Sequence, residues 1–255
     1  MSKSSLFELS TTEAGDLLKR TDLGAIAIGA TEQHGPHLPL GTDAMGAFAV
    51  ARRLAERIDV VLAPMIPFGM SEYHMTWPGT ITLSASTVTA LLKDVARSLI
   101  RHGVKRIVII NGHEGNAPSI QVAASEIQWE TGVPFLVVPY FAAARTVFDV
   151  TERGHGGRME TSAVLAYDST LVNFEAVQAG GSTYDESLKR HDVYRGAAIY
   201  AVLRDFHQVS DVGWFGRAAE ATTDDAERLV QEVTDQIIAR LPDLEVSEPR
   251  ALAHA

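Results

Sequence analysis

The sequence predicts an α/β protein, a single three-layer α/β/α domain with a mostly parallel central sheet. Two observations predict this class: short apolar runs typical of buried strands, and amphipathic helical patterns between them. Strands that alternate with helices of this length form parallel sheets with helices on both faces. No linker, repeat or low-complexity tract divides the chain, so we expect one domain over residues 1–255.

Four short runs are expected to form the strands. Two are continuous apolar runs, AIAIG at 25–29 and RIVII at 106–110. Two more, at 60–64 and 135–139, have the same β-branched character and end in proline. Runs of this length bounded by turn signals are typical of fully buried strands.

Helical patterns are expected to form helices at 44–57, 87–102, 117–130 and 222–241. Ser86 is expected to open the second of these helices and Gly103 to close it. The last helix has threonines at its start, acidic residues in its first turn and apolar residues at helical spacing. We expect residues 180–191 to form a polar surface excursion and residues 247–255 to be frayed.

The composition disfavours several classes of protein. The chain has 32 acidic and 22 basic residues and a formal net charge of −10, which opposes nucleic-acid binding because that binding needs phosphate neutralisation. It has no cysteine, which excludes disulfides, thiolate ligands and a cysteine nucleophile. No signal-peptide pattern is present, and no apolar run approaches the ~20 residues that span a bilayer. We therefore expect a cytoplasmic protein without a membrane partner.

Histidines gather where the active site of such a sheet is expected. In open α/β sheets this site forms at the carboxyl ends of the strands. The loops that follow three of the expected strands contain ATEQHGPHLPLGTD, NGHEGN and RGHGGRMETS, and a fourth loop contains SEYHMTWPGT. Five of the nine histidines lie in these loops: His34, His37, His74, His113 and His155. Core packing does not produce this distribution.

Two of these histidines and two nearby carboxylates have a spacing that predicts a two-metal centre. Glu32 and His34 are two residues apart, so both side chains point the same way in an extended chain. Asp43 lies just before an expected helix, and a glycine-flanked loop places His113. Imidazole and carboxylate ligands without sulfur suit zinc, manganese or iron(II). Asp43 can bridge two ions ~3.5–4 Å apart. The alternative, that each side chain is separately a loop cap or a solvated group, stays open.

Motifs of other hydrolytic and nucleotide-binding classes are not found. The sequence has no Gly-x-Ser-x-Gly, so a nucleophile elbow is not expected. His113 and Glu114 are not followed by a second histidine at zincin spacing, and the glycines around them lack the Lys-Ser/Thr of a phosphate loop.

Four segments resemble the signature blocks of the creatininase family: TEQHGPHLPLGTD, SEYHMTWPGTITLS, VIINGHEGN and GHGGRMETS. A fifth, SDVGWFGRAAEATTDDAERL, is more weakly similar to the family's C-terminal segment, and the blocks run in family order from about residue 24 to residue 230. The resemblance implies a hydrolase that cleaves an amide or cyclic amide with a water activated by two metal ions. It also implies Glu32, His34, Asp43 and His113 as ligands, His155 as an acid/base residue, and a homo-oligomer that is a hexamer.

The chain departs from this pattern at two positions. Creatininase has an acidic ligand two residues after the histidine, where this chain has Gly115. The candidates for the remaining ligand are Glu114 and Glu160, and we prefer Glu160 because it opens an expected helix; Glu114 then remains a candidate substrate contact. The second departure is at Arg158, where many relatives have Glu. Arg158 is expected either to bind an anionic group of the substrate or to form a surface ion pair.

The sequence leaves the substrate open. His74 either contacts it or ties down its own loop, and Trp77 is a candidate substrate contact that we expect to serve mainly in packing. The resemblance implies that creatininase closes over its small flat substrate with tryptophans from the region around the GHGGRMETS block, but residues 140–160 of this chain contain none. The same stretch supplies Arg153 and Arg158, and creatinine has no anionic group to pair with them, so creatinine is not expected. We therefore expect a small polar or anionic substrate. Hydrolysis of a C–C or ester bond at the same centre, or a non-catalytic metal- or ligand-binding protein, remain the alternatives.

Overall fold

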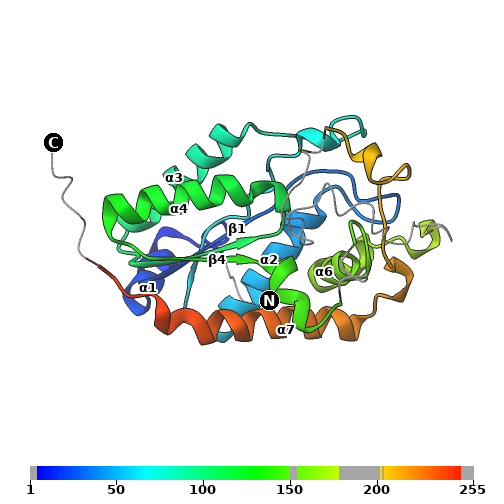
Figure 1. The fold of residues 1–255 in the computed structure, drawn as a ribbon. Helices are drawn as coiled ribbons and strands as arrows, with labels where there is room; N and C mark the ends of the chain where they lie inside the picture. Colours follow the sequence, from blue (N-terminus) through cyan, green and yellow to red (C-terminus); the bar gives the residue numbers. More distant parts are fainter. Residues whose placement is uncertain (1–4, 150–153, 178–201, 203, 248–255) are drawn as a thin grey trace.

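A computed structural model describes residues 5–149, 154–177, 202 and 204–247 (Figure 1). The expected surface excursion at 180–191 lies outside the described residues, as does the expected frayed end from residue 248 onward. Among the described residues, no helix is long and apolar enough to cross a membrane.

The central sheet has four parallel strands in the order β2-β1-β3-β4. Their bounds are β1 (Leu23–Ile28), β2 (Val61–Leu62), β3 (Arg106–Asn111) and β4 (Phe135–Pro139). All four predicted strands are confirmed, although β2 is shorter than predicted. Among the described residues it pairs only with β1, at the edge of the sheet.

Helices cover both faces of this sheet, so the predicted three-layer α/β/α class is confirmed (Figure 1). Leu23, Ala25 and Ala27 of β1 pack in one core with α2 (Thr42–Arg57), α6 (Arg158–Asp168) and α7 (Thr223–Arg240). Ile26 and Ile28 pack in the opposite core with α3 (Ala85–Arg101) and α4 (Ala117–Thr131). Alternate residues of a strand point to opposite faces, so these buried strands supply side chains to both cores.

Polar caps set where the helices begin. Thr222 caps α7 and accepts a hydrogen bond from the backbone N–H of Asp225, as its sequence signature indicates. The prediction that Ser86 opens α3 is wrong. Ser84 is the cap, because its hydroxyl accepts the N–H of Thr87 at 3.1 Å, and the helix therefore starts at Ala85.

Further short elements lie outside the predicted ones. Two are α-helical, α1 (Thr11–Arg20) and α5 (Tyr140–Ala143). The described 3₁₀ turns are η1 (Glu72–His74), η2 (Glu114–Asn116), η3 (Ala144–Thr146), η4 (Ser169–Leu171), η5 (Phe174–Ala176), η8 (Phe206–Gln208), η9 (Ala218–Glu220) and η10 (Leu241–Asp243). Of these, η1 and η8 contribute residues to the site described below, and η2 directly follows His113.

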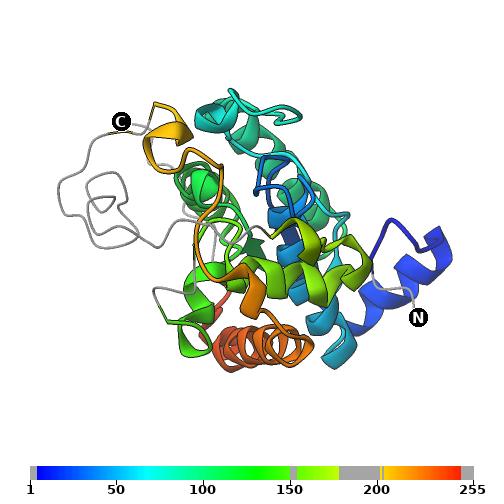
Figure 2. The same cartoon turned by 90° about the vertical axis from the view of Figure 1, so that its right-hand side faces the viewer.

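The strand order reverses between β1 and β3, because β2 lies on one side of β1 and β3 on the other. Such switch points are where open α/β sheets bind ligands. Glycines let the start of α2 approach this point: a Cβ on Gly29 would lie 2.1 Å from the Ala44 nitrogen, and a Cβ on Gly112 would lie 2.0 Å from the Asp43 carbonyl oxygen. The chain after β1 extends toward the right of Figure 1, the side that faces the viewer in Figure 2.

Candidate metal centre

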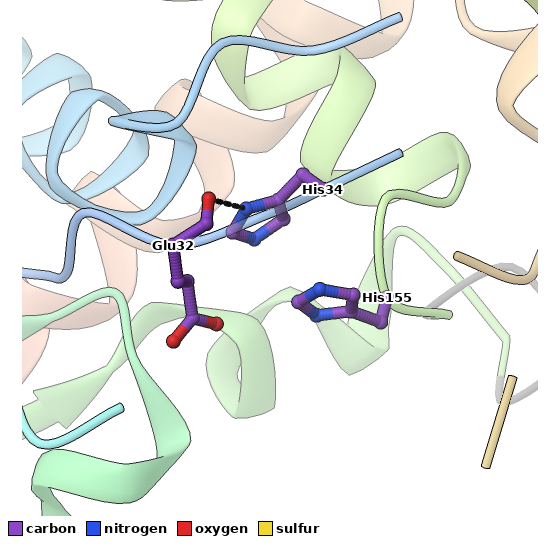
Figure 3. A group of neighbouring side chains, drawn as sticks. All are labelled: Glu32, His34 and His155. Atoms are coloured by element: carbon purple, nitrogen blue, oxygen red, sulfur yellow. Dashed lines mark hydrogen bonds between the residues drawn. The ribbon is translucent and has the colours of Figure 1, made fainter. Parts of the chain in front are cut away.

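Glu32 and His34 leave β1 in an extended segment and are both buried. The Glu32 N–H donates to the Leu40 carbonyl at 2.8 Å, which fixes the segment. His34 Nδ1 donates to the Glu32 carbonyl oxygen at 3.1 Å (Figure 3). This leaves His34 Nε2 free to face the carboxylates of Asp43 and Glu160. The predicted alternation therefore brings both side chains to one centre.

Asp43 lies in the first turn of α2, where the helix dipole favours a carboxylate. Its Oδ1 is 3.1 Å from His34 Nε2, and its Oδ2 is 3.1 Å from His113 Nδ1. His113 Nε2 donates to the Met70 carbonyl at 2.9 Å, so both histidines use their second nitrogen on a backbone carbonyl. Metal-ligating histidines are typically oriented in this way.

The side chains around Asp43 form two clusters that share it. Glu32, Asp43 and His113 make one, and His34, Asp43 and Glu160 make the other; within each, the potential ligand atoms lie within 4.8 Å of one another. Among the described residues, no hydrogen-bond donor reaches the buried Glu32 Oε2. A buried carboxylate oxygen without a partner is costly, and a cation would satisfy it. The donor set therefore fits a pair of metal ions.

The electrostatics of the protein alone also fit cations. Burial lowers the pKa of His34, but nearby carboxylates, Asp43 foremost, outweigh burial and raise it to about 10. Burial likewise opposes the charged form of His113, and Glu32 and Asp43 raise its pKa to about 9. Burial raises the pKa of Glu32 to about 7. The carboxylates thus keep the imidazoles of His34 and His113 protonated. Bound cations would displace these protons and take over their positive charge.

Of the two candidates for the remaining ligand, the structure brings Glu160 to the centre. Glu160 lies in the first turn of α6, as predicted, and its Oε2 is 3.7 Å from His34 Nε2. The same oxygen accepts a hydrogen bond from the Gly156 N–H. Glu114 lies in η2 and belongs to neither cluster around Asp43.

His155 and His74 form a layer of neutral rings beside these clusters. The His155 ring stacks on His34 with centroids 4.2 Å apart and on His74 with centroids 4.9 Å apart. Burial, with His34 and His74 nearby, lowers the pKa of His155 well below its ordinary value. Its Nε2 donates to the Gln33 carbonyl at 2.7 Å, so Nδ1 keeps a lone pair. Figure 3 shows His155 beside Glu32 and His34, with which it forms a third potential ligand cluster.

Two contacts of this layer were not predicted. The Gln33 amide Nε2 lies 3.1 Å from His74 Nδ1 and 3.1 Å from His155 Nε2. Because His155 Nε2 carries a proton, the amide donates to His74. The Phe206 ring packs 4.4 Å from His74 and 4.6 Å from His155. The position of Gln33 between Glu32 and His34 was a usable signal; no sequence pattern indicated Phe206.

The remaining predicted residues are placed as follows. His74 Nε2 is 3.3 Å from Glu32 Oε1, and burial lowers the pKa of His74 to about 2. Arg158 makes a two-pronged contact with Asp225 of α7, at 3.1 Å from Nε and 2.9 Å from Nη2. This is the ion-pair alternative that the sequence left open. Arg153 lies outside the described residues.

Trp77 lines a pocket of about 470 Å³ next to the histidine layer. The pocket has six apolar lining side chains: Pro36, Leu40, Trp77, Pro78, Val212 and Trp214. Trp77 also stacks on His207, with ring centroids 4.5 Å apart. It therefore packs, as expected, and also contributes a wall of the pocket.

A parallel α/β sheet with two imidazole–carboxylate clusters at its switch point fits a metal-dependent hydrolase. A sequence profile of the creatininase family, described as creatinine amidohydrolase, matches residues 7–241. The chain belongs to the creatininase family and is a hydrolase. The resemblance in the signature blocks is thereby confirmed.

Three relatives show the range of the family. The chain is 31% identical over 241 residues to the mycofactocin precursor peptide peptidase of Mycolicibacterium smegmatis, covering 91% of this chain and 90% of that protein. It is 31% identical over 173 residues to the creatinine amidohydrolase of Pseudomonas putida, covering 60% and 66%. It is 28% identical over 160 residues to the 3-dehydro-scyllo-inosose hydrolase of Thermotoga maritima, covering 58% and 51%.

Solved structures of creatininases share the fold. One creatinine amidohydrolase is 26% identical with a TM-score of 0.74, covering 97% of this chain and all of the other. A creatininase mutant described as Zn–Zn type is 25% identical with a TM-score of 0.73, covering 96% and 99%. A creatininase described as the Mn form is also 25% identical with a TM-score of 0.73, covering 95% and 99%.

Proposed function

We propose that this chain hydrolyses the C–N bond of an amide or cyclic amide at a centre of two divalent metal ions. The proposed ligands are Glu32, His34, Asp43, His113 and Glu160. The observation that carries the proposal is the position of Asp43, whose two oxygens each lie 3.1 Å from a different histidine. The names of two relatives, a peptide peptidase and a creatinine amidohydrolase, support an amide-type bond.

The protein's own groups would act around the ions. When bound, two divalent ions activate a water molecule and polarise the carbonyl that it attacks. His155 would accept a proton from the attacking water on Nδ1, where its neutral ring keeps a lone pair, and would give that proton to the leaving nitrogen. The Gln33 amide and carbonyl hold His74 and His155 in register, and Phe206 covers both rings against water.

Zinc is the proposed metal, with manganese and iron(II) as the alternatives. Imidazole nitrogens and carboxylate oxygens suit all three ions, and the chain has no cysteine to select a softer metal. Two solved creatininases are described as Zn–Zn and Mn forms, which supports zinc and manganese. A cytoplasmic homo-oligomer, a hexamer as the resemblance implies, remains part of this proposal.

The expectation of an anionic substrate loses its main support. It relied on Arg158 and Arg153, and the Arg158 guanidinium is engaged by Asp225. The alternative of C–C bond hydrolysis is favoured by one observation. A relative is named 3-dehydro-scyllo-inosose hydrolase, and that name contains no amide.

A substrate screen tests the proposal. The protein, loaded with zinc or manganese, is incubated with cyclic amides, formamides, short peptides and cyclic diketones, and addition of water is followed by mass spectrometry. We expect turnover of an amide, a loss of at least about a hundredfold in Asp43→Asn, and no loss in Asp16→Asn. Asp16 is an exposed aspartate on α1, so it controls for the same chemical change. Turnover of the diketones alone would replace the proposal by its alternative.

A further inference from the structure

The pocket beside the histidine layer has the character of a site for an uncharged apolar group. Its volume is about 470 Å³, and two tryptophans, two prolines, a leucine and a valine line it. None of the described residues that line it is charged. Sites for apolar groups are typically concave, lined by such side chains and oriented by a few polar groups.

The extended segment after β1 separates this pocket from the proposed metal ligands. Glu32 and His34 contribute to the candidate ligand clusters, and Gln33 lies between them in the chain. The Gln33 side chain lines the pocket, and its Nε2 lies 3.1 Å from both His74 Nδ1 and His155 Nε2. Gln33 therefore links the pocket to the two histidines that lie beside the candidate metal ligands.

The walls of the pocket are held in place by packing. Trp214 is 4% exposed, and a Cβ on Gly35, whose φ is +73°, would lie 2.5 Å from the Trp214 ring. His37 contacts the same ring edge-on with centroids 4.7 Å apart, and its Nε2 donates to the Gly156 carbonyl beside His155. The other lining tryptophan, Trp77, is stacked on His207. A pocket formed in advance loses little conformational entropy on binding.

We propose that this pocket is the subsite for an aromatic or branched apolar group adjacent to the scissile carbonyl. This inference rests on the proposed amide hydrolysis and names its substrate class, an amide with a large apolar substituent. Burial of such a substituent between Trp77 and Trp214 supplies the binding energy, while the carbonyl lies at the proposed metal centre.

Tryptophan fluorescence tests the subsite directly. The chain has three tryptophans, and the third, Trp129, is exposed on α4. In a Trp129→Phe background, both remaining reporters line the pocket. The probes are N-acetyl-phenylalaninamide, N-acetyl-leucinamide and N-acetyl-glycinamide, titrated into protein treated with a chelator. We expect the first two to shift the emission and to bind at least about tenfold more tightly than the third.

Two valines of equal exposure provide the variant and its control. Val212 lines the pocket and Val122 lies on α4, and both are 48% exposed. Val212→Asp places a charge at the pocket and should weaken binding of N-acetyl-phenylalaninamide about tenfold or more. Val122→Asp should leave that binding unchanged. Equal binding of all three probes, or equal effects of the two substitutions, would overturn the subsite.

This design separates the two proposals. Binding by chelated protein needs no hydrolysis, so the pocket can be confirmed even if no amide is cleaved. Conversely, amide turnover by the metal-loaded protein that shows no preference for apolar substituents, and that Val212→Asp leaves unchanged, would refute the subsite and leave the hydrolase proposal standing.

Discussion

Asp43 is buried, so its carboxylate needs compensating charge on both oxygens. His34 and His113 supply that compensation in the protein alone: although burial opposes ionisation, these two imidazoles lower the pKa of Asp43 below its ordinary value. The helix dipole of α2 acts in the same direction. At the residue scale, the protons on His34 and His113 therefore balance the Asp43 carboxylate, and divalent ions can replace them.

Metal binding should release protons. The pKa of His34 is raised to about 10 and that of His113 to about 9, so both rings are protonated near neutral pH. Both must lose a proton before they can bind a cation. We predict the release of about two protons per chain, and an affinity for zinc that rises with pH up to these values. Calorimetry in buffers of different ionisation enthalpy measures the release, and heats that are independent of the buffer would contradict it.

A second residue-scale prediction separates the two candidate glutamates. Glutamine keeps the volume of glutamate but loses its charge. Because Glu160 contributes to a cluster around Asp43 and Glu114 does not, Glu160→Gln should lose one of two ions and Glu114→Gln should keep both. Elemental analysis after dialysis provides the comparison. The opposite pattern would show that the acid next to His113 is the ligand.

At the element scale, the close approach of α2 to the strand ends positions Asp43. A Cβ on Gly29 would lie 2.1 Å from the Ala44 backbone nitrogen, so Gly29→Ala must move the start of α2. We predict a loss of metal content and a destabilisation of about 1–3 kcal/mol. Gly15→Ala in α1 is the control, since a Cβ there has nothing within 4 Å. Normal metal content in Gly29→Ala would show that the approach is not needed.

The ion pair between α6 and α7 should hold in place the helix that carries Glu160. Burial raises the pKa of Asp225, but hydrogen bonds from Arg158 and Thr222 outweigh burial, so the pKa is lowered. The resulting stabilisation is complete above the ordinary aspartate pKa of about 4 and is lost as pH falls through the lowered value. We predict that Asp225→Asn costs about 1–3 kcal/mol in urea unfolding at neutral pH, and much less in acid.

An exposed pair on the same helix gives the comparison. Glu227 of α7 pairs with Arg53 of α2 at 2.7 Å, but its side chain is 63% exposed. Glu227→Gln should cost less than about 1 kcal/mol, because exposed ion pairs contribute little. If the two variants lose equal stability, the Arg158–Asp225 pair is not a special contact between α6 and α7.

Local sequence patterns predicted most of the strands and helices but not the contacts between distant parts of the chain. The strands and the helix at 223–240 were predictable because apolar runs and capping residues are local signals. The start of α3 was misplaced because Ser84 and Ser86 both precede the helical pattern, and only the backbone geometry selects Ser84. The partner of Arg158 was not predictable, because Asp225 is 67 residues away along the chain. Phe206 escaped notice for the same reason.

On the scale of the whole molecule, the faces of the sheet form the apolar cores and its carboxyl end carries the candidate metal site. Its two faces are buried in apolar cores, while the side chains of the candidate ligand clusters gather beyond the carboxyl ends of β1 and β3. The family-specific blocks supply the loops at this end, and the fold brings together residues from position 32 to position 160. The proposed ligands could therefore be named from the sequence, whereas the apolar pocket needed the structure.

The metal content of wild type and Asp43→Asn, measured by elemental analysis after zinc loading and dialysis, tests the central claim most directly. Because Asp43 belongs to both clusters, its loss should affect both ions, whereas the exposed Asp16→Asn should change nothing. We predict about two ions per chain in wild type and in Asp16→Asn, and fewer than about half an ion in Asp43→Asn. A wild-type protein that holds fewer than about half an ion per chain, or an Asp43→Asn variant that retains both, would contradict a two-metal centre built on Asp43.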